Sequence, residues 1–125
     1  MRVRNITRAG PIAGQVKVAS SFLGRLVGLM GRGHLEADAG LYLAPCNSIH
    51  MFFMRFAIDT IWLGKRTPEG SYPVLRLDRG LRPWFGLVPL VRGAEAVIEL
   101  PTGVIERSAT AVGDLLSLDP DPGAK

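Results

Sequence analysis

Several residue types and patterns are scarce in this chain. Its 125 residues include one cysteine and two histidines, and only 7% of them are aromatic. A single cysteine cannot form an internal disulfide. No apolar run approaches the ~20 residues that a membrane-spanning helix needs, and no hydrophobic stretch follows the basic N-terminal segment as it would in a signal peptide. We therefore expect a soluble, cytoplasmic protein with no membrane partner.

Concentrated positive charge is also absent. The formal net charge is +4, but the arginines are scattered and acidic residues lie between them after residue 36. A nucleic-acid-binding domain usually shows a basic patch together with an aromatic-plus-basic motif or a helix-turn-helix, and neither pattern occurs here. Nucleic acid is therefore an unlikely partner. With 47% hydrophobic and 21% charged residues, the composition is typical of a globular protein.

The chain alternates short β-rich runs with Gly and Pro turns, which is typical of antiparallel sheets. The expected strands cover residues 15–18, 40–44, 58–63, 74–77, 96–100 and a last run that ends at 118. Helical spacing and capping residues predict a helix over about 22–30 and a helical turn at 104–109. We predict a mainly β (α+β) fold, a small antiparallel barrel or curled sheet with one or two short helices.

This predicted fold occupies one domain, residues 1–118, and a flexible tail of residues 119–125 follows it. Residues 46–54 fit neither element clearly. Cys46, His50 and Met54 are four residues apart, a spacing that places them on one face of a helix and also on one side of a strand.

The segment around these three residues carries most of the chemistry of the sequence. It reads Cys46-Asn-Ser-Ile-His50-Met51-Phe-Phe-Met54, and Arg55 and Asp59 follow it closely. A thiol, an imidazole, a guanidinium and a carboxylate together suit a metal site, an activated nucleophile or a pocket for a small anion. Each residue also has an ordinary structural role, with Cys46 and the methionines as buried filler.

Motifs along nearly the whole chain carry a resemblance to one family. They include Gly28-Leu-Met30, Pro45-Cys-Asn-Ser-Ile-His50, Ile58-Asp59, Glu99-Leu-Pro-x-Gly103 and Gly113-Asp114, in the order and spacing of that family. The chain resembles the domain of unknown function 192 family, a group of small prokaryotic proteins. The resemblance implies no particular activity. Relatives often lack a counterpart of the Cys46 and His50 pair, so it implies no essential role for that pair either.

Two catalytic or metal hypotheses compete with simple binding. In the first, Cys46 is a nucleophile activated by His50, with an acid such as Asp59 orienting the imidazole, in a thiol-dependent or hydrolytic enzyme. In the second, thiolate, imidazole and thioether bind a soft metal. The first lacks an evident oxyanion hole, and the second is short of the four ligands that a structural zinc site needs. We therefore expect no bound metal and no cofactor.

The remaining hypothesis is a non-catalytic pocket for a small polar or anionic ligand or a partner protein. Such pockets are mostly apolar and contain a few convergent polar groups. Phe85 is expected to contribute to the apolar wall. The predicted ligand-binding residues are His50, Met54, Arg55, Asp59, Arg79 and Trp84. Binding is favoured over catalysis, with Cys46 expected to be buried and inert.

Overall fold

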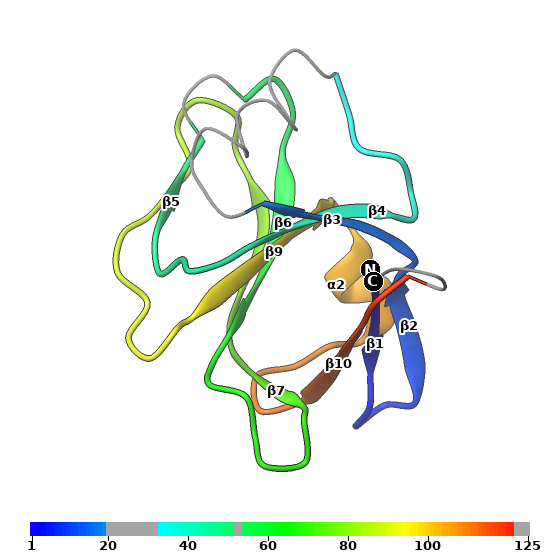
Figure 1. Ribbon diagram of the computed structural model, residues 1–125. Helices are drawn as coiled ribbons and strands as arrows, with labels where there is room; N and C mark the ends of the chain where they lie inside the picture. Colours follow the sequence, from blue (N-terminus) through cyan, green and yellow to red (C-terminus); the bar gives the residue numbers. More distant parts are fainter. Residues whose placement is uncertain (20–32, 52–53, 122–125) are drawn as a thin grey trace.

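The computed structural model describes residues 1–19, 33–51 and 54–121. These residues form ten strands and one short helix, and Figure 1 labels all of them except β8. The elements are β1 (Arg2–Asn5), β2 (Gly10–Ala13), β3 (Gln15–Ala19), β4 (Ala39–Leu43), β5 (Ile49–His50), β6 (Ile58–Leu63), β7 (Tyr72–Leu81), β8 (Leu87–Val88), β9 (Ala96–Pro101), α2 (Val104–Ser108) and β10 (Leu115–Asp119).

Eight of the strands form one mixed sheet, in the order β2-β1-β10-β7-β6-β9-β4-β3. All neighbours pair antiparallel except β3 and β4, which are parallel. The sheet curls until its ends approach each other. Met1 and Val16 exchange two backbone hydrogen bonds, of 3.0 Å and 2.9 Å, but the described strands do not close into a barrel.

The predicted mainly β fold is confirmed, in its curled-sheet form. The expected strands appear as β3, β4, β6, β7, β9 and β10, and the helical turn appears as α2. The antiparallel expectation is wrong for β3 and β4, because strand partners along a curled sheet are chosen by non-local packing. Strands β1 and β2 were not predicted, and the expected helix at 22–30 lies outside the described residues.

Strand β6 is buried on both faces because a hydrophobic cluster covers each of them. Side chains alternate between the two faces of a strand. Ile61 and Leu63 accordingly belong to the cluster inside the curl, which also includes residues of α2. Ile58 and Trp62 belong to a second cluster, together with Ile49, Met51, Met54, Val88 and Val91. The second cluster therefore packs part of the segment singled out in the sequence against the sheet.

Asp59 is a buried carboxylate at the centre of this arrangement, with an exposed fraction of 1%. Its Oδ1 accepts a hydrogen bond from the backbone N–H of Gly80, at the end of β7 (2.9 Å). Its Oδ2 accepts from the N–H groups of Gly103 (3.0 Å) and Ile105 (3.1 Å), at the start of α2. One side chain therefore joins β6, the end of β7 and the helix.

A second buried carboxylate, Asp114, joins the first and last strands. Its Oδ2 accepts hydrogen bonds from Asn5 Nδ2 (2.9 Å), the Ala111 backbone N–H (2.9 Å) and Arg8 Nε (2.8 Å). Burial alone would raise the pKa of Asp114. The hydrogen bonds from Asn5, Ala111 and Arg8, together with the Arg8 charge, outweigh burial and hold this pKa below its ordinary value of 3.8.

Replacing Asp59 by alanine should destabilise the fold severely. Three backbone N–H groups would lose their acceptor, and each buried donor left unsatisfied costs about 1–3 kcal/mol. We expect the free energy of unfolding in urea to fall by about 3 kcal/mol in Asp59→Ala, less than the simple sum because water can reach Gly80 and Gly103. The control Glu69→Ala removes an exposed carboxylate and should change stability by less than about 0.5 kcal/mol. Equal stability of the two variants would contradict this role.

Asp114 should make stability depend on acid pH. Because its folded-state pKa is lowered, its contribution is fully present above the unfolded value and is lost as pH falls through the folded value. Between pH 5 and pH 2, the thermal midpoint of the wild type should fall more steeply than that of Asp114→Asn, which cannot titrate at this position. Parallel curves for the two proteins would show that Asp114 is not the group responsible.

Candidate functional site

The candidate site is built on a two-stranded ribbon, β5 and β8, that packs over the second hydrophobic cluster. The register pairs Ile49 with Val88 and His50 with Leu87. Ile49 and Val88 are buried in the cluster, so their neighbours along each strand face away from it. Backbone hydrogen bonds continue beyond both ends of this pairing. One of them, from Val91 N–H to Asn47 O (2.8 Å), joins the chain after β8 to the chain before β5.

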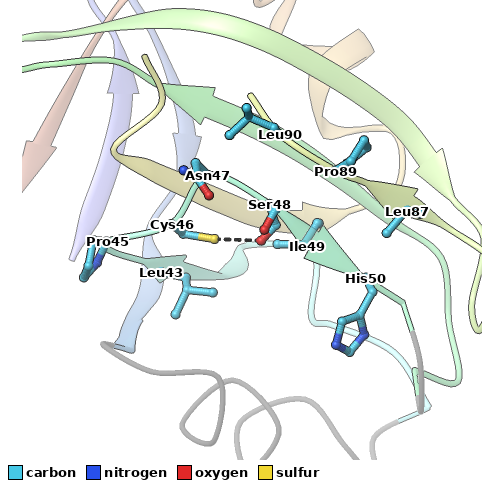
Figure 2. A pocket seen from close by; sticks show the side chains of 10 residues that line it. All are labelled: Leu43, Pro45, Cys46, Asn47, Ser48, Ile49, His50, Leu87, Pro89 and Leu90. Atoms are coloured by element: carbon cyan, nitrogen blue, oxygen red, sulfur yellow. Dashed lines mark hydrogen bonds between the residues drawn. The ribbon is translucent and has the colours of Figure 1, made fainter. Parts of the chain in front are cut away.

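A cavity of about 610 Å³ lies beside this ribbon (Figure 2). Its polar wall comes from the chain before and within β5, and its apolar wall comes mainly from β8 and the residues after it. The described lining residues are Leu43, Pro45, Cys46, Asn47, Ser48, Ile49, His50, Leu87, Pro89 and Leu90. The cavity therefore combines a broad apolar surface with a few hydrogen-bonding side chains, all from one short segment.

Cys46 is half-buried at the edge of this cavity. Its Sγ donates a hydrogen bond to the backbone carbonyl oxygen of Ser48, at 3.1 Å. Figure 2 shows the thiol directed toward Ser48, whereas the imidazole of His50 points away from it. A protonated thiol can donate such a hydrogen bond to a carbonyl oxygen, whereas a thiolate cannot.

The structure brings together only part of the predicted binding set. His50 lines the cavity with Cys46, and Met54 is buried in the cluster beneath the ribbon. Asp59 directs both oxygens at backbone N–H groups of β7 and α2. Arg55 and Arg79 are exposed. The described residues that line the cavity do not include Met54, Arg55, Asp59, Arg79 or Trp84.

Sequence reasoning did not single out the apolar wall or two polar residues of the cavity. Asn47 and Ser48 lie inside the segment already marked by its cysteine and histidine, but amides and hydroxyls are too common to stand out. The signal that was available is the run Leu87-Val-Pro-Leu90. A proline in a short apolar run disfavours a central strand, which leaves leucines exposed and free to line a cavity.

The described residues also bear on metal binding and on membranes. They contain no group of three or more His, Cys, Asp or Glu residues placed to hold a metal ion. Within the same described part of the chain, no helix has the length and apolar character that crossing a membrane requires.

The chain is thus a small, mainly β protein. Its described part has a curled, mostly antiparallel sheet, one short helix and a cavity beside the two-stranded ribbon. Within this class, the chain belongs to the domain of unknown function 192 family, described as "Uncharacterized ACR", whose model matches residues 4–118. The resemblance noted in the sequence is thereby confirmed.

Proteins similar to this chain come from archaea and bacteria. A UPF0127 protein of Thermococcus sibiricus is 37% identical over 115 residues, which are 88% of this chain and 70% of that protein. A UPF0127 protein of Pyrococcus furiosus is 33% identical over 90% of this chain and 93% of its own length.

Two solved structures share the fold, each with a TM-score of 0.74. One is a protein of unknown function from Novosphingobium aromaticivorans, which is 20% identical, with 94% of this chain and 82% of that chain covered. The other is described as a putative transcription regulator from Sinorhizobium meliloti and is 22% identical, with coverages of 93% and 91%. At these identities the likeness shows the fold alone.

Alkylation of Cys46 should be independent of His50. A thiol bonded to a carbonyl is not activated, and only the thiolate is nucleophilic. We expect native-state alkylation by iodoacetamide at neutral pH, followed by mass spectrometry, to be slow, to accelerate in denaturant and to keep the same rate in His50→Ala. Fast native alkylation that slows in His50→Ala would instead indicate an activated nucleophile.

Proposed function

We propose that the protein binds a small ligand with an apolar body and one polar or anionic group in the cavity beside β5 and β8. The observation that carries this proposal is the make-up of the cavity wall. Small-molecule sites are typically ~300–1,000 Å³ in volume, mostly apolar, and equipped with a few convergent polar groups. A cavity of about 610 Å³ lined by leucines and prolines, with an amide, a hydroxyl and an imidazole, fits that description.

The polar group of the ligand would bind along residues 47–50. Asn47, Ser48 and His50 all carry hydrogen-bond donors, which suits a ligand oxygen or a small anion. No acidic side chain is among the described lining residues, so no carboxylate at the wall would repel an anion. The net charge of +4 also raises the local concentration of anionic ligands.

The apolar body of the ligand would pack against Leu87, Pro89 and Leu90. Both leucines are largely exposed, at 63% and 60%. Exposed leucine side chains gain free energy when a ligand removes them from water, at roughly 25 cal/mol per Å² of apolar surface. The prolines restrict the backbone on both sides of the cavity, so little conformational entropy would be lost on binding.

Binding is favoured over thiol catalysis by the hydrogen bond of Cys46 to Ser48 and by the position of Asp59. A nucleophilic cysteine is activated by a base that a third group orients. Here the sulfur donates to the Ser48 carbonyl oxygen, and the carboxylate of Asp59, the expected orienting acid, accepts backbone N–H groups at another place in the fold. The proposal therefore makes Cys46 part of the cavity wall rather than its reacting group.

The cavity should bind anilinonaphthalenesulfonate, a fluorescent probe with an aromatic body and an anionic group. We expect a saturable rise in fluorescence corresponding to one site per chain. Ser48→Phe should weaken binding strongly, because the new ring would occupy part of the cavity and remove the hydroxyl group. His50→Ala should weaken binding by about tenfold, the effect of losing one hydrogen bond to a charged group.

Two control variants separate the cavity from other apolar surfaces. Thr102→Phe adds the same ring at an exposed turn, and Phe85→Ser removes the most exposed aromatic side chain among the described residues. Both should bind the probe as the wild type does. Nile red, which has no anionic group, should bind equally well to the wild type and to His50→Ala. Unchanged probe affinity in Ser48→Phe, with an unaltered thermal midpoint, would contradict the proposal.

A further inference from the structure

A second feature, which shares Leu87 and Leu90 with the cavity wall, is a loop with unusually exposed apolar side chains. The loop, residues 82–90, carries Trp84 (49% exposed), Phe85 (84%), Leu87 (63%) and Leu90 (60%). Among the described residues, the other large hydrophobic side chains with comparable exposure are Ile6, Val18 and Val112, which belong to other parts of the chain. The exposed apolar surface of the described residues is therefore concentrated in this one loop.

The backbone of the loop is held in a defined shape. Trp84 N–H donates to Met51 O (2.8 Å), and Gly86 N–H donates to Arg82 O (2.9 Å). Trp84 has a φ of 68°, a conformation that few non-glycine residues adopt. A Cβ on Gly86 would lie 2.6 Å from Met51 Cγ and 2.9 Å from Arg82 O, so only glycine fits there. The aromatic pair is thus presented to solvent by a tightly bonded turn.

The charged residues of the sequence around this turn are all basic. Between Asp78 and Glu95 the sequence contains Arg79, Arg82 and Arg92 and no acidic residue, and all three arginines are exposed. Exposed apolar side chains next to arginines complement a surface that has anionic groups on the outside and an apolar layer beneath them.

We propose that the loop of residues 82–90 docks on the surface of an anionic phospholipid bilayer. Tryptophan favours the interface between lipid and water, and apolar side chains next to cations bind such interfaces reversibly. The sequence predicted no membrane partner because the chain has no spanning segment, but peripheral docking does not require one. This inference goes beyond the proposed ligand binding. Leu87 and Leu90 belong to both surfaces, but Trp84 and Phe85, which the tests below change, are not among the described residues that line the cavity.

A lipid surface fits the loop better than a protein partner does. The exposed apolar surface of the loop is a narrow tip of four side chains, whereas a stable protein interface buries about 800 Å² on each partner. A narrow tip can enter a fluid interface without a matching pocket on the other side. A rigid protein would have to supply such a pocket together with acidic groups opposite the arginines.

Co-sedimentation with vesicles tests the proposal. The chain should sediment with vesicles of phosphatidylcholine and phosphatidylglycerol, much less with phosphatidylcholine alone, and less at high salt. Phe85→Ser should weaken binding to the anionic vesicles by at least tenfold, and Arg82→Glu by a similar factor. The matched controls are Val112→Ser, which removes an apolar side chain that is 61% exposed elsewhere, and Arg4→Glu on β1. Both should bind nearly as the wild type does.

Tryptophan fluorescence gives a second readout. Of the two tryptophans, Trp62 is fully buried and Trp84 is half exposed, so lipid should change the emission of Trp84 alone. We expect a blue shift on anionic vesicles and quenching by brominated lipid, both absent in Trp84→Phe.

Three outcomes would overturn the proposal, provided that the variants keep the wild-type thermal midpoint. The first is failure of the wild type to sediment with anionic vesicles. The second is equal loss of binding in Phe85→Ser and Val112→Ser. The third is a dimer in analytical ultracentrifugation that Phe85→Ser dissociates, which would assign the loop to contact with a second copy of the chain.

Discussion

The three hydrogen bonds of the Asp59 carboxylate hold β6, the end of β7 and the start of α2 together. A buried carboxylate is costly unless its oxygens accept hydrogen bonds, and here the donors are backbone N–H groups of Gly80, Gly103 and Ile105. Gly80 lies near the end of β7, and the exposed loop starts two residues later. The loop, with β8 inside it, therefore begins directly after a point of the backbone that the Asp59 side chain holds.

Burial of β6 on both faces determines where a cavity can form. Hydrophobic clusters cover both sides of the strand, so the centre of the sheet is filled. The β5–β8 ribbon adds a further layer through Ile49 and Val88, and its remaining side chains face away from the core. Leu87 and Leu90 line the cavity, while Trp84 and Phe85 lie earlier in the same loop. The two proposed binding surfaces are thus neighbours that one rigid turn positions.

The sequence predicted those features that depend on nearby residues. Alternation and turn residues were enough for the β6–β7 hairpin and for β9, and unusual residue types marked the segment that contains His50. Which strands pair with each other depends on contacts between residues far apart in the sequence. The parallel pairing of β3 with β4 therefore had no sequence signal. The hydrogen bonds of Asp59 are non-local as well. The carboxylate was expected beside a ligand because it follows a polar segment, whereas its donors come from residues 21 and 44 positions further along the chain.

The chemistry of Cys46 and His50 depends on the backbone between them. In a helix, residues four apart bring their Cβ atoms within roughly 6 Å, close enough for an imidazole to activate a thiol. Instead the chain is irregular from Cys46 to Ser48 and then enters β5, and four residues of extended chain can span up to roughly 13 Å. The thiol turns to the Ser48 carbonyl oxygen, and the imidazole is left beside the apolar wall of β8. The same residues that would face each other on a helix thus lie at separate places along the wall of one cavity.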